Sequence, residues 1–325
     1  RAVAVGQSAL VAQNFTTATD NYNVAVGYFA AGSLTTGIQS VFIGGLSGDA
    51  ITVAADNTAV GYASLSDETG GQNNVAIGRS ALTSQNNSSG NIYNTGVGSQ
   101  AGREITTGIS NTIIGGLAGD ALTDADFNVV VGRGALTTDT LGSRSVAVGY
   151  EALGAQNFTT ATNSLNTAVG FQAGANVTTG TQNTIVGSNA GDAINTGQAN
   201  SCFGMEAGSN ITTGGNNMCL GHDSGLTGSP GGNITTNSHA IVLGDENILG
   251  LHCQVALTVA SDERDKTDFS ELDLGLNFVK ALEPVTYYWD KRSKYGDKYA
   301  DDYDLNAQTP DGTHKEDWMD VGFKA

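Results

Sequence analysis

A short apolar stretch recurs along the first 250 residues, and each time it ends in glycine and is followed by polar residues. Its commonest form is Asn-x-x-(Val/Ile)-Gly, as in NVAVG from Asn23 and NTIIG from Asn111. The closing glycines lie at positions 6, 27, 44, 61, 78, 98, 115, 132, 149, 170, 187, 204, 221 and 244. Their spacing is 17 residues, and every fourth unit carries a few more. Self-similarity at a fixed period identifies a tandem repeat.

The repeat unit predicts stacked strands. Seventeen residues are too few for a helical-hairpin repeat or a propeller blade. Short β-branched runs followed by turn sequences, such as Thr-Thr-Gly at 35–37 and 106–108, are typical of strands and turns. Such units stack so that each strand pairs with its equivalent one coil away. We therefore predict a mainly β fold, a parallel β-solenoid or β-roll of about fourteen 17-residue coils over residues 1–250.

Several columns of residues follow from this stacking. Asparagine at one register in ten coils predicts a ladder of side-chain amides, and the glycines predict tight turns with positive φ. Cys202 and Cys219 share a register, either as a disulfide or, as we favour, as two small stacked core residues. Asp49, Asp120 and Asp192 recur in Gly-Asp-Ala. They lie four coils apart, about 19 Å, so we expect turn caps rather than one shared ion site.

The repeat resembles the head region of trimeric autotransporter adhesins, where short repeats around Asn/Ser-x-Ala-(Ile/Val)-Gly wind a left-handed parallel β-roll. The resemblance covers about residues 1–250, although the units here are longer and carry a regular insertion. In that family three chains associate side by side. A solenoid built from small residues such as Ala-Val-Gly has a thin core, so burial between chains is the expected route to stability. We expect an obligate homotrimer.

The longer units predict loops on one side of the rod, about four coils apart. Their aromatic residues Tyr22, Tyr93 and Phe158 are candidate contacts for a host cell-surface glycan or protein receptor. The alternative is that the loops pack between chains of the trimer, because insertions in repeats often, but not always, mark the binding face. The inserted segments are 15–23, 86–94, 158–166 and 229–239.

Composition changes at Ser261. The first 260 residues contain no lysine and five of the fourteen basic residues, and the net charge of the chain is −18. Without a basic patch, nucleic acid is not an expected partner. No apolar run approaches the roughly 20 residues of a membrane span, so no membrane insertion is expected. Three cysteines make no disulfide framework, and His222, His239, His252 and His314 show no metal-ligand spacing, so we expect no metal and no cofactor.

The segment from Ser261 begins SDERDK and predicts a small α+β domain. Leucines and valine at helical spacing predict a helix up to Glu283-Pro284, and VTYYW over 285–289 predicts a strand. Ser-Asp-x-Arg-x-Lys followed by helix, proline and strand resembles the intramolecular chaperone auto-processing domain that ends many phage tail fibres, tailspikes and endosialidases. We place a linker at 251–260 and this domain at 261–325. The domain is expected to be truncated and the chain to be a fragment at its N-terminus.

The resemblance implies a single self-cleavage. In that family the serine is the nucleophile and the lysine is its base, which here makes Ser261 and Lys266 the catalytic pair and Ala260–Ser261 the scissile bond. A partly desolvated lysine has a lowered pKa and can take the proton of a serine hydroxyl. The expected function is a virion tail fibre for host attachment, made in the host cytoplasm and joined to other tail proteins. The alternatives are a trimeric autotransporter-type surface adhesin and a polysaccharide-degrading tailspike.

Overall fold

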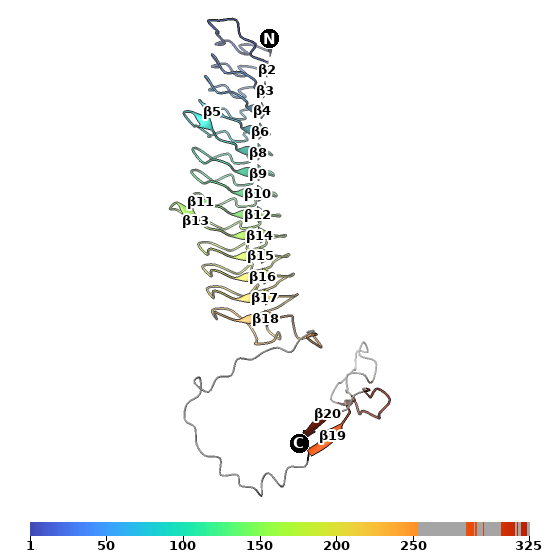
Figure 1. Ribbon diagram of the computed structural model, residues 1–325. Helices are drawn as coiled ribbons and strands as arrows, with labels where there is room; N and C mark the ends of the chain where they lie inside the picture. The colour runs from blue at the N-terminus through green and yellow to red at the C-terminus, as the bar shows by residue number, and fades with distance from the viewer. Residues whose placement is uncertain are drawn as a thin grey trace. The chain divides into compact units, whose positions relative to one another are not determined.

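The computed structural model describes residues 1–252, 284–288, 290, 295, 307–315, 317 and 320–323. The chain divides into two compact units, Arg1–Leu251 and His252–Ala325. The first unit is a stack of coils (Figure 1), which confirms the predicted β-solenoid. Among the described residues, none belongs to a helix that is long and apolar enough to cross a membrane.

One parallel sheet of fourteen short strands runs the length of the solenoid. Each coil adds one strand, which pairs with its equivalents in the coils before and after it, so the predicted stacking is confirmed. The strands are β1 (Val3–Val5), β2 (Val24–Val26), β3 (Val41–Ile43), β4 (Thr58–Val60), β6 (Val75–Ile77), β8 (Thr95–Val97), β9 (Thr112–Ile114), β10 (Val129–Val131), β12 (Val146–Val148), β14 (Thr167–Val169), β15 (Thr184–Val186), β16 (Ser201–Phe203), β17 (Met218–Leu220) and β18 (Ile241–Leu243).

Two smaller parallel sheets form beside the main one, at the inserted segments. The first pairs β5 (Gly71–Gln72) with β7 (Gly90–Asn91), and the second pairs β11 (Gly142–Ser143) with β13 (Thr162–Asn163). Figure 1 shows β5, β11 and β13 projecting on the side of the solenoid opposite the main column of strands. The expected placement of these insertions on one side of the stack is therefore observed.

In every strand of the main sheet except β1, which lies at the end of the stack, the middle residue is buried. In β10, Val130 is fully buried whereas Val129 is 38% exposed, because successive side chains of a strand point to opposite faces. The inward position holds alanine in many coils, as in Ala147 of β12 and Ala168 of β14. The core is accordingly thin, and the larger apolar residues that precede each glycine face outward.

The asparagine column forms a buried ladder that binds mainly the backbone. The side chain of Asn111 donates from Nδ2 to the carbonyl oxygen of Ala125 at 2.7 Å, and its Oδ1 accepts from the backbone N–H of Asn128 at 2.9 Å. Equivalent bonds recur along the stack. Direct amide–amide bonds are fewer, as from Asn111 Nδ2 to Asn94 Oδ1 at 3.3 Å. The predicted ladder is confirmed, with the backbone as its main partner.

The column of glycines is required by close packing between coils. Gly115 has a φ of +137° and Gly132 a φ of +135°, as predicted for these turns. A Cβ built on Gly115 would stand 2.5 Å from the carbonyl oxygen of Gly132, far inside van der Waals contact. The same relation repeats between consecutive glycines from Gly6 to Gly204. Glycine is therefore demanded both by the backbone angle and by the space.

Two side-chain arrangements fill the core between the strand and the far turn. In one, a glycine with positive φ faces a large apolar residue, as Gly119 faces Leu122. In the other, leucine takes the glycine's place and a polar residue replaces the apolar one, as with Leu136 and Asp139. A Cβ on Gly119 would lie 2.9 Å from Leu122 Cδ1, so the two large residues exclude each other.

Two cysteines at the middle positions of neighbouring strands are stacked and form no disulfide. Cys202 of β16 pairs in register with Cys219 of β17, and both side chains are fully buried. The contact with the Cys219 thiol and burial in the apolar core raise the pKa of Cys202 well above its usual range. Our preference for a packed pair over a disulfide is confirmed. Cys253 lies outside the described residues.

Candidate functional site

The outer face of the main sheet is an uncharged apolar surface that follows the whole solenoid. The two outward residues of each strand are Val, Ile, Leu, Met, Phe, Thr or Ser in all fourteen strands. Monomeric soluble proteins rarely expose apolar patches larger than a few hundred Å². The most exposed members are Val3, Val5, Ile43, Ile77, Ile114, Val129, Val169, Phe203, Met218, Leu220, Ile241 and Leu243.

Exposed aromatic residues border this face. Tyr150 and Phe171 follow the glycines of neighbouring coils and stack with ring centroids 5.3 Å apart. Tyr22 lines a shallow cleft with Val3 and Val24, so it adjoins the outer face at the first two strands. Tyr93 is 56% exposed and precedes a ladder asparagine as Tyr22 does. The two tyrosines expected to face a receptor are thus exposed, and Tyr22 lies beside the apolar sheet face.

Phe158 does not share this exposure. Its side chain is 6% exposed and packs over Gly142 of β11, where a Cβ would lie 2.9 Å from Phe158 Cδ2. A buried ring is unavailable to a receptor, so including Phe158 among the exposed loop residues is wrong. Leu165, which also precedes a ladder asparagine, is exposed in this insertion instead.

A buried carboxylate anchors the inserted segment 86–94. Glu68 is fully buried, and its Oε1 accepts from the backbone N–H groups of Gly70 at 3.0 Å and Gly71 at 2.6 Å. Its Oε2 accepts from Gln85 Nε2 at 2.8 Å, and Gln85 Oε1 accepts from Asn94 Nδ2 at 2.9 Å. This chain of hydrogen bonds joins the base of the insertion to the asparagine ladder.

The inserted segment 158–166 is anchored in the same way by a shorter acidic side chain. Asp139 is fully buried, and its Oδ1 accepts from the N–H groups of Gly142 at 3.1 Å and Phe158 at 2.9 Å. Its Oδ2 accepts from Gln156 Nε2 at 2.6 Å, and Gln156 passes the network to Asn166 at 2.8 Å. A polar group is tolerated in the core when hydrogen-bond donors satisfy its lone pairs in this way. Sequence reasoning missed these anchors, although a polar residue at a core register of the repeat was their signal.

The Gly-Asp-Ala aspartates differ in how well they are satisfied. Asp120 Oδ1 accepts from Thr137 Oγ1 of the next coil at 2.6 Å, which is a bond between coils. Asp49 has a buried Oδ1 without a hydrogen-bond donor in the described part of the chain. Desolvation by burial raises the pKa of Asp49 and of Asp192 above the usual range.

The described part of the second unit contains one pair of antiparallel strands. Strand β19 (Pro284–Tyr287) pairs antiparallel with β20 (Asp320–Phe323), and β19 overlaps the strand expected over 285–289 at residues 285–287. Both oxygens of Asp290 accept from Tyr295 Oη at 2.8 Å, and Gly312 N–H donates to Asp290 Oδ2 at 2.7 Å. The proposed dyad of Ser261 and Lys266, the bond after Ala260 and the expected helix lie outside the described residues.

Comparison with known proteins bears on this second unit. Residues 261–322 match the model of the family described as chaperone of endosialidase, which supports a C-terminal chaperone domain. Searches of curated proteins and of solved structures returned no match. A β-solenoid followed by a chaperone domain of this family fits a phage tail fibre or tailspike in general terms.

Proposed function

We propose that the protein is a homotrimeric phage tail fibre in which the solenoid is the shaft and residues 261–325 direct assembly. It is made in the host cytoplasm, joins other tail proteins and reaches its host as part of the virion. The uncharged outer face of the fourteen-stranded sheet is the observation that carries this proposal. A partner for such a face needs the same length and the same rise per coil, and a second and third copy of the chain provide both.

Assembly is followed by self-cleavage in this proposal. The Ser261 hydroxyl attacks the carbonyl carbon of Ala260 while Lys266 takes its proton, and the C–N bond breaks as that proton passes to the Ser261 amine. Water then hydrolyses the resulting ester between Ala260 and the Ser261 oxygen, which frees the chaperone. Without the chaperone the trimer cannot readily refold, so its persistence depends on its rate of unfolding. The chaperone family matched at 261–322 supports this order of events.

Expression of the complete gene product tests the proposal. It should yield a fragment whose new N-terminus is Ser261, detected by mass spectrometry. Ser261→Ala and Lys266→Ala should each abolish the fragment and leave trimers intact, whereas Ser270→Ala, a nearby serine outside the hexapeptide, should cleave normally. Cleavage that persists in Ser261→Ala would refute the assignment.

Host attachment belongs to the same proposal, with Tyr22 and Tyr93 as candidate contacts for a surface glycan or protein. Both rings are about half exposed, and aromatic faces are common in recognition surfaces. Tyr22→Ala and Tyr93→Ala together should reduce adsorption of assembled particles to host cells without changing trimer mass. Unchanged adsorption would assign both rings to the interface between chains.

A trimeric surface adhesin is the second candidate, because the repeat resembles autotransporter heads. Antibody labelling of the native source distinguishes the two: signal on purified virions supports the tail fibre, and signal in the bacterial outer membrane supports the adhesin. Loss of viscosity of host capsular polysaccharide on incubation with the protein would instead indicate a degrading tailspike.

A further inference from the structure

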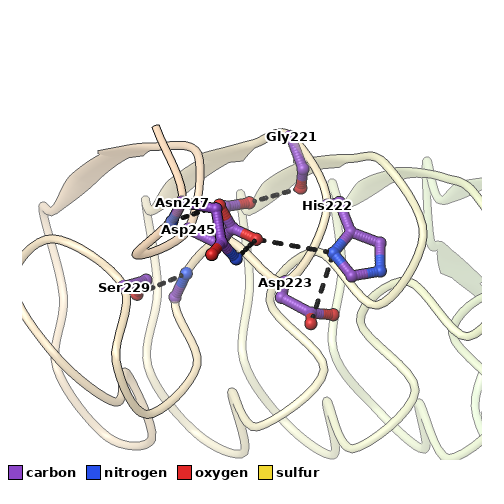
Figure 2. A network of polar contacts seen from close by, with 8 residues as sticks. Gly221, His222, Asp223, Ser229, Asp245 and Asn247 are labelled. Atoms are coloured by element: carbon purple, nitrogen blue, oxygen red, sulfur yellow. Dashed lines mark hydrogen bonds and ion pairs between the residues drawn. The ribbon is translucent and has the colours of Figure 1, made fainter. Parts of the chain in front are cut away.

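Three metal-ligating side chains converge where the last two coils of the solenoid meet (Figure 2). His222 follows Gly221, the glycine that ends β17, and Asp245 follows Gly244, the glycine that ends β18. The register that pairs β17 with β18 brings these two positions one above the other. Asp223, next in sequence to His222, completes the group.

The spacing of the three ligand atoms matches a metal's coordination shell. His222 Nδ1 lies 3.3 Å from Asp223 Oδ2 and 3.7 Å from Asp245 Oδ2, and all three atoms lie within 4.8 Å of one another. Ligands about 2.0–2.2 Å from a tetrahedral zinc ion stand about 3.3–3.5 Å apart. To hold a cation, the two distances from His222 Nδ1 to the carboxylate oxygens therefore need to change by only a few tenths of an ångström.

The cluster also has unsatisfied capacity for a cation. Asp223 Oδ1 is buried and has no hydrogen-bond donor among the described residues. Two carboxylates face a single imidazole here, and His222 is their only ion-pair partner within the described part of the chain. A buried oxygen without a donor is costly, and a cation bound at Oδ2 of the same carboxylate would offset part of that cost through its charge.

The surroundings hold one ligand in place. Asp245 has a side chain only 14% exposed, and it accepts from Asn247 N–H at 2.9 Å and from Asn247 Nδ2 at 3.0 Å (Figure 2). Hydrogen bonds of this kind orient metal-binding carboxylates and sustain affinity.

We propose that His222, Asp223 and Asp245 bind one divalent transition-metal ion of the zinc class, with the remaining position left to water. An imidazole nitrogen with two carboxylates suits zinc and its neighbours, whereas calcium takes six to eight oxygen ligands and magnesium keeps several waters. The ion joins the last coil to the one before it. Strand β18 is the terminal strand of the sheet and has a neighbour on one side only, so a cross-link at this position resists fraying of the stack.

Zinc titration of the full chain tests the site. After dialysis against EDTA, isothermal titration with ZnCl₂ should give one saturable site per chain, and zinc should raise the melting temperature of the solenoid. Co²⁺ should give the visible absorption of a four-coordinate ion. His222→Ala, Asp223→Asn and Asp245→Asn should each weaken zinc binding by at least as much as the loss of an outer-shell partner does, which is roughly 10- to 100-fold.

Control variants separate this site from other sources of binding. His239→Ala removes an exposed histidine outside the cluster, whose ring contacts Asn216, and should bind zinc as the wild type does. Circular dichroism in EDTA should be the same for all variants, because the His222 and Asp223 side chains are partly exposed and Asp245→Asn keeps the shape of its side chain. Absence of saturable zinc binding, binding unchanged in His222→Ala, or a preference for calcium or magnesium would overturn the proposal.

Discussion

Gly115 and Gly132 stand one coil apart with so little room between them that a Cβ on the first would lie 2.5 Å from the carbonyl oxygen of the second. The relation recurs along the column of glycines, including those 20 or 21 residues apart, so the close stacking of the coils requires glycine at this register. Side chains of the strands decide which surfaces are buried, but this column decides how closely the coils stack.

Gly115→Ala should destabilise the solenoid severely, by more than 3 kcal/mol, because it adds a Cβ clash to a φ that L residues rarely adopt. Gly116→Ala is the matched control, since its Cβ would meet nothing nearer than 3.9 Å. Thermal melting followed by circular dichroism separates them. Equal melting temperatures for the two variants would show that the coils move apart easily.

Asn111→Leu should cost about 1–3 kcal/mol, because the N–H of Asn128 and the carbonyl of Ala125 lose their side-chain partner in the core. Asn111→Ser should cost less. Ser40 occupies the same register, and its Oγ accepts from the N–H of Asn57 at 3.1 Å. Chemical denaturation of the three proteins measures the order. A leucine variant as stable as the wild type would show that the asparagine ladder does not stabilise the solenoid.

Asp139→Ala should loosen the inserted segment 158–166 before it unfolds the solenoid. The substitution leaves the N–H of Phe158 without its acceptor and leaves Gln156 Nε2 with Ser145 Oγ alone, at about 1–3 kcal/mol for each lost buried hydrogen bond. Limited proteolysis should then cut within this insertion. Asp124→Ala, which removes an exposed carboxylate bonded to Thr107, is the control and should keep the wild-type pattern.

Asp49→Asn should stabilise the protein at neutral pH. Burial raises the pKa of Asp49 in the folded state above its unfolded value. The folded state therefore binds more protons in the window just above the ordinary aspartate pKa, and stability from this group grows as pH falls through that window. The asparagine variant should show a higher melting temperature at pH 7 and a weaker dependence on pH between roughly 4 and 6.

Asp120→Asn is the comparison for this test, since Asp120 already accepts from Thr137 in the next coil. It should bring no stabilisation at pH 7. An unchanged pH profile in Asp49→Asn would mean that the charge of Asp49 is well solvated.

The period of the repeat was sufficient to predict stacked parallel strands, the asparagine register and the turn glycines, because each depends on spacing alone. It did not predict which face of each strand is inside. Residues before the glycines, such as Ile114, are large and apolar, yet they point outward because alternation places the middle residue in the core. The more hydrophobic face is therefore the exposed one.

The site residues likewise divide into those whose position follows from the repeat spacing and those whose position does not. Tyr22 and Tyr93 were predicted exposed and are, because they occupy a fixed register beside the ladder. The prediction that Phe158 is exposed is wrong. The repeat offers no equivalent residue within an insertion from which the direction of the Phe158 side chain could be inferred. His222 and Asp245 lie 23 residues apart, which fits no sequence motif for metals, and only the longer last unit brings them into register. Ser261 and Lys266 stay predictions.

Trimer formation through the outer sheet face is the central claim, and it can be tested by placing charges on that face. The variant combines Ile114→Glu, Val169→Glu and Phe203→Glu, all outward residues of the main sheet. A control places the same three charges on exposed residues of the inserted segments, at Ser88, Ser89 and Thr160.

Sedimentation equilibrium of the full chain is the most direct measurement. The wild type and the control should have the mass of three chains, and the sheet-face variant should have the mass of one chain while keeping the circular dichroism of the β-solenoid. A wild type with the mass of a single chain, or a sheet-face variant that keeps the mass of three, would contradict the account.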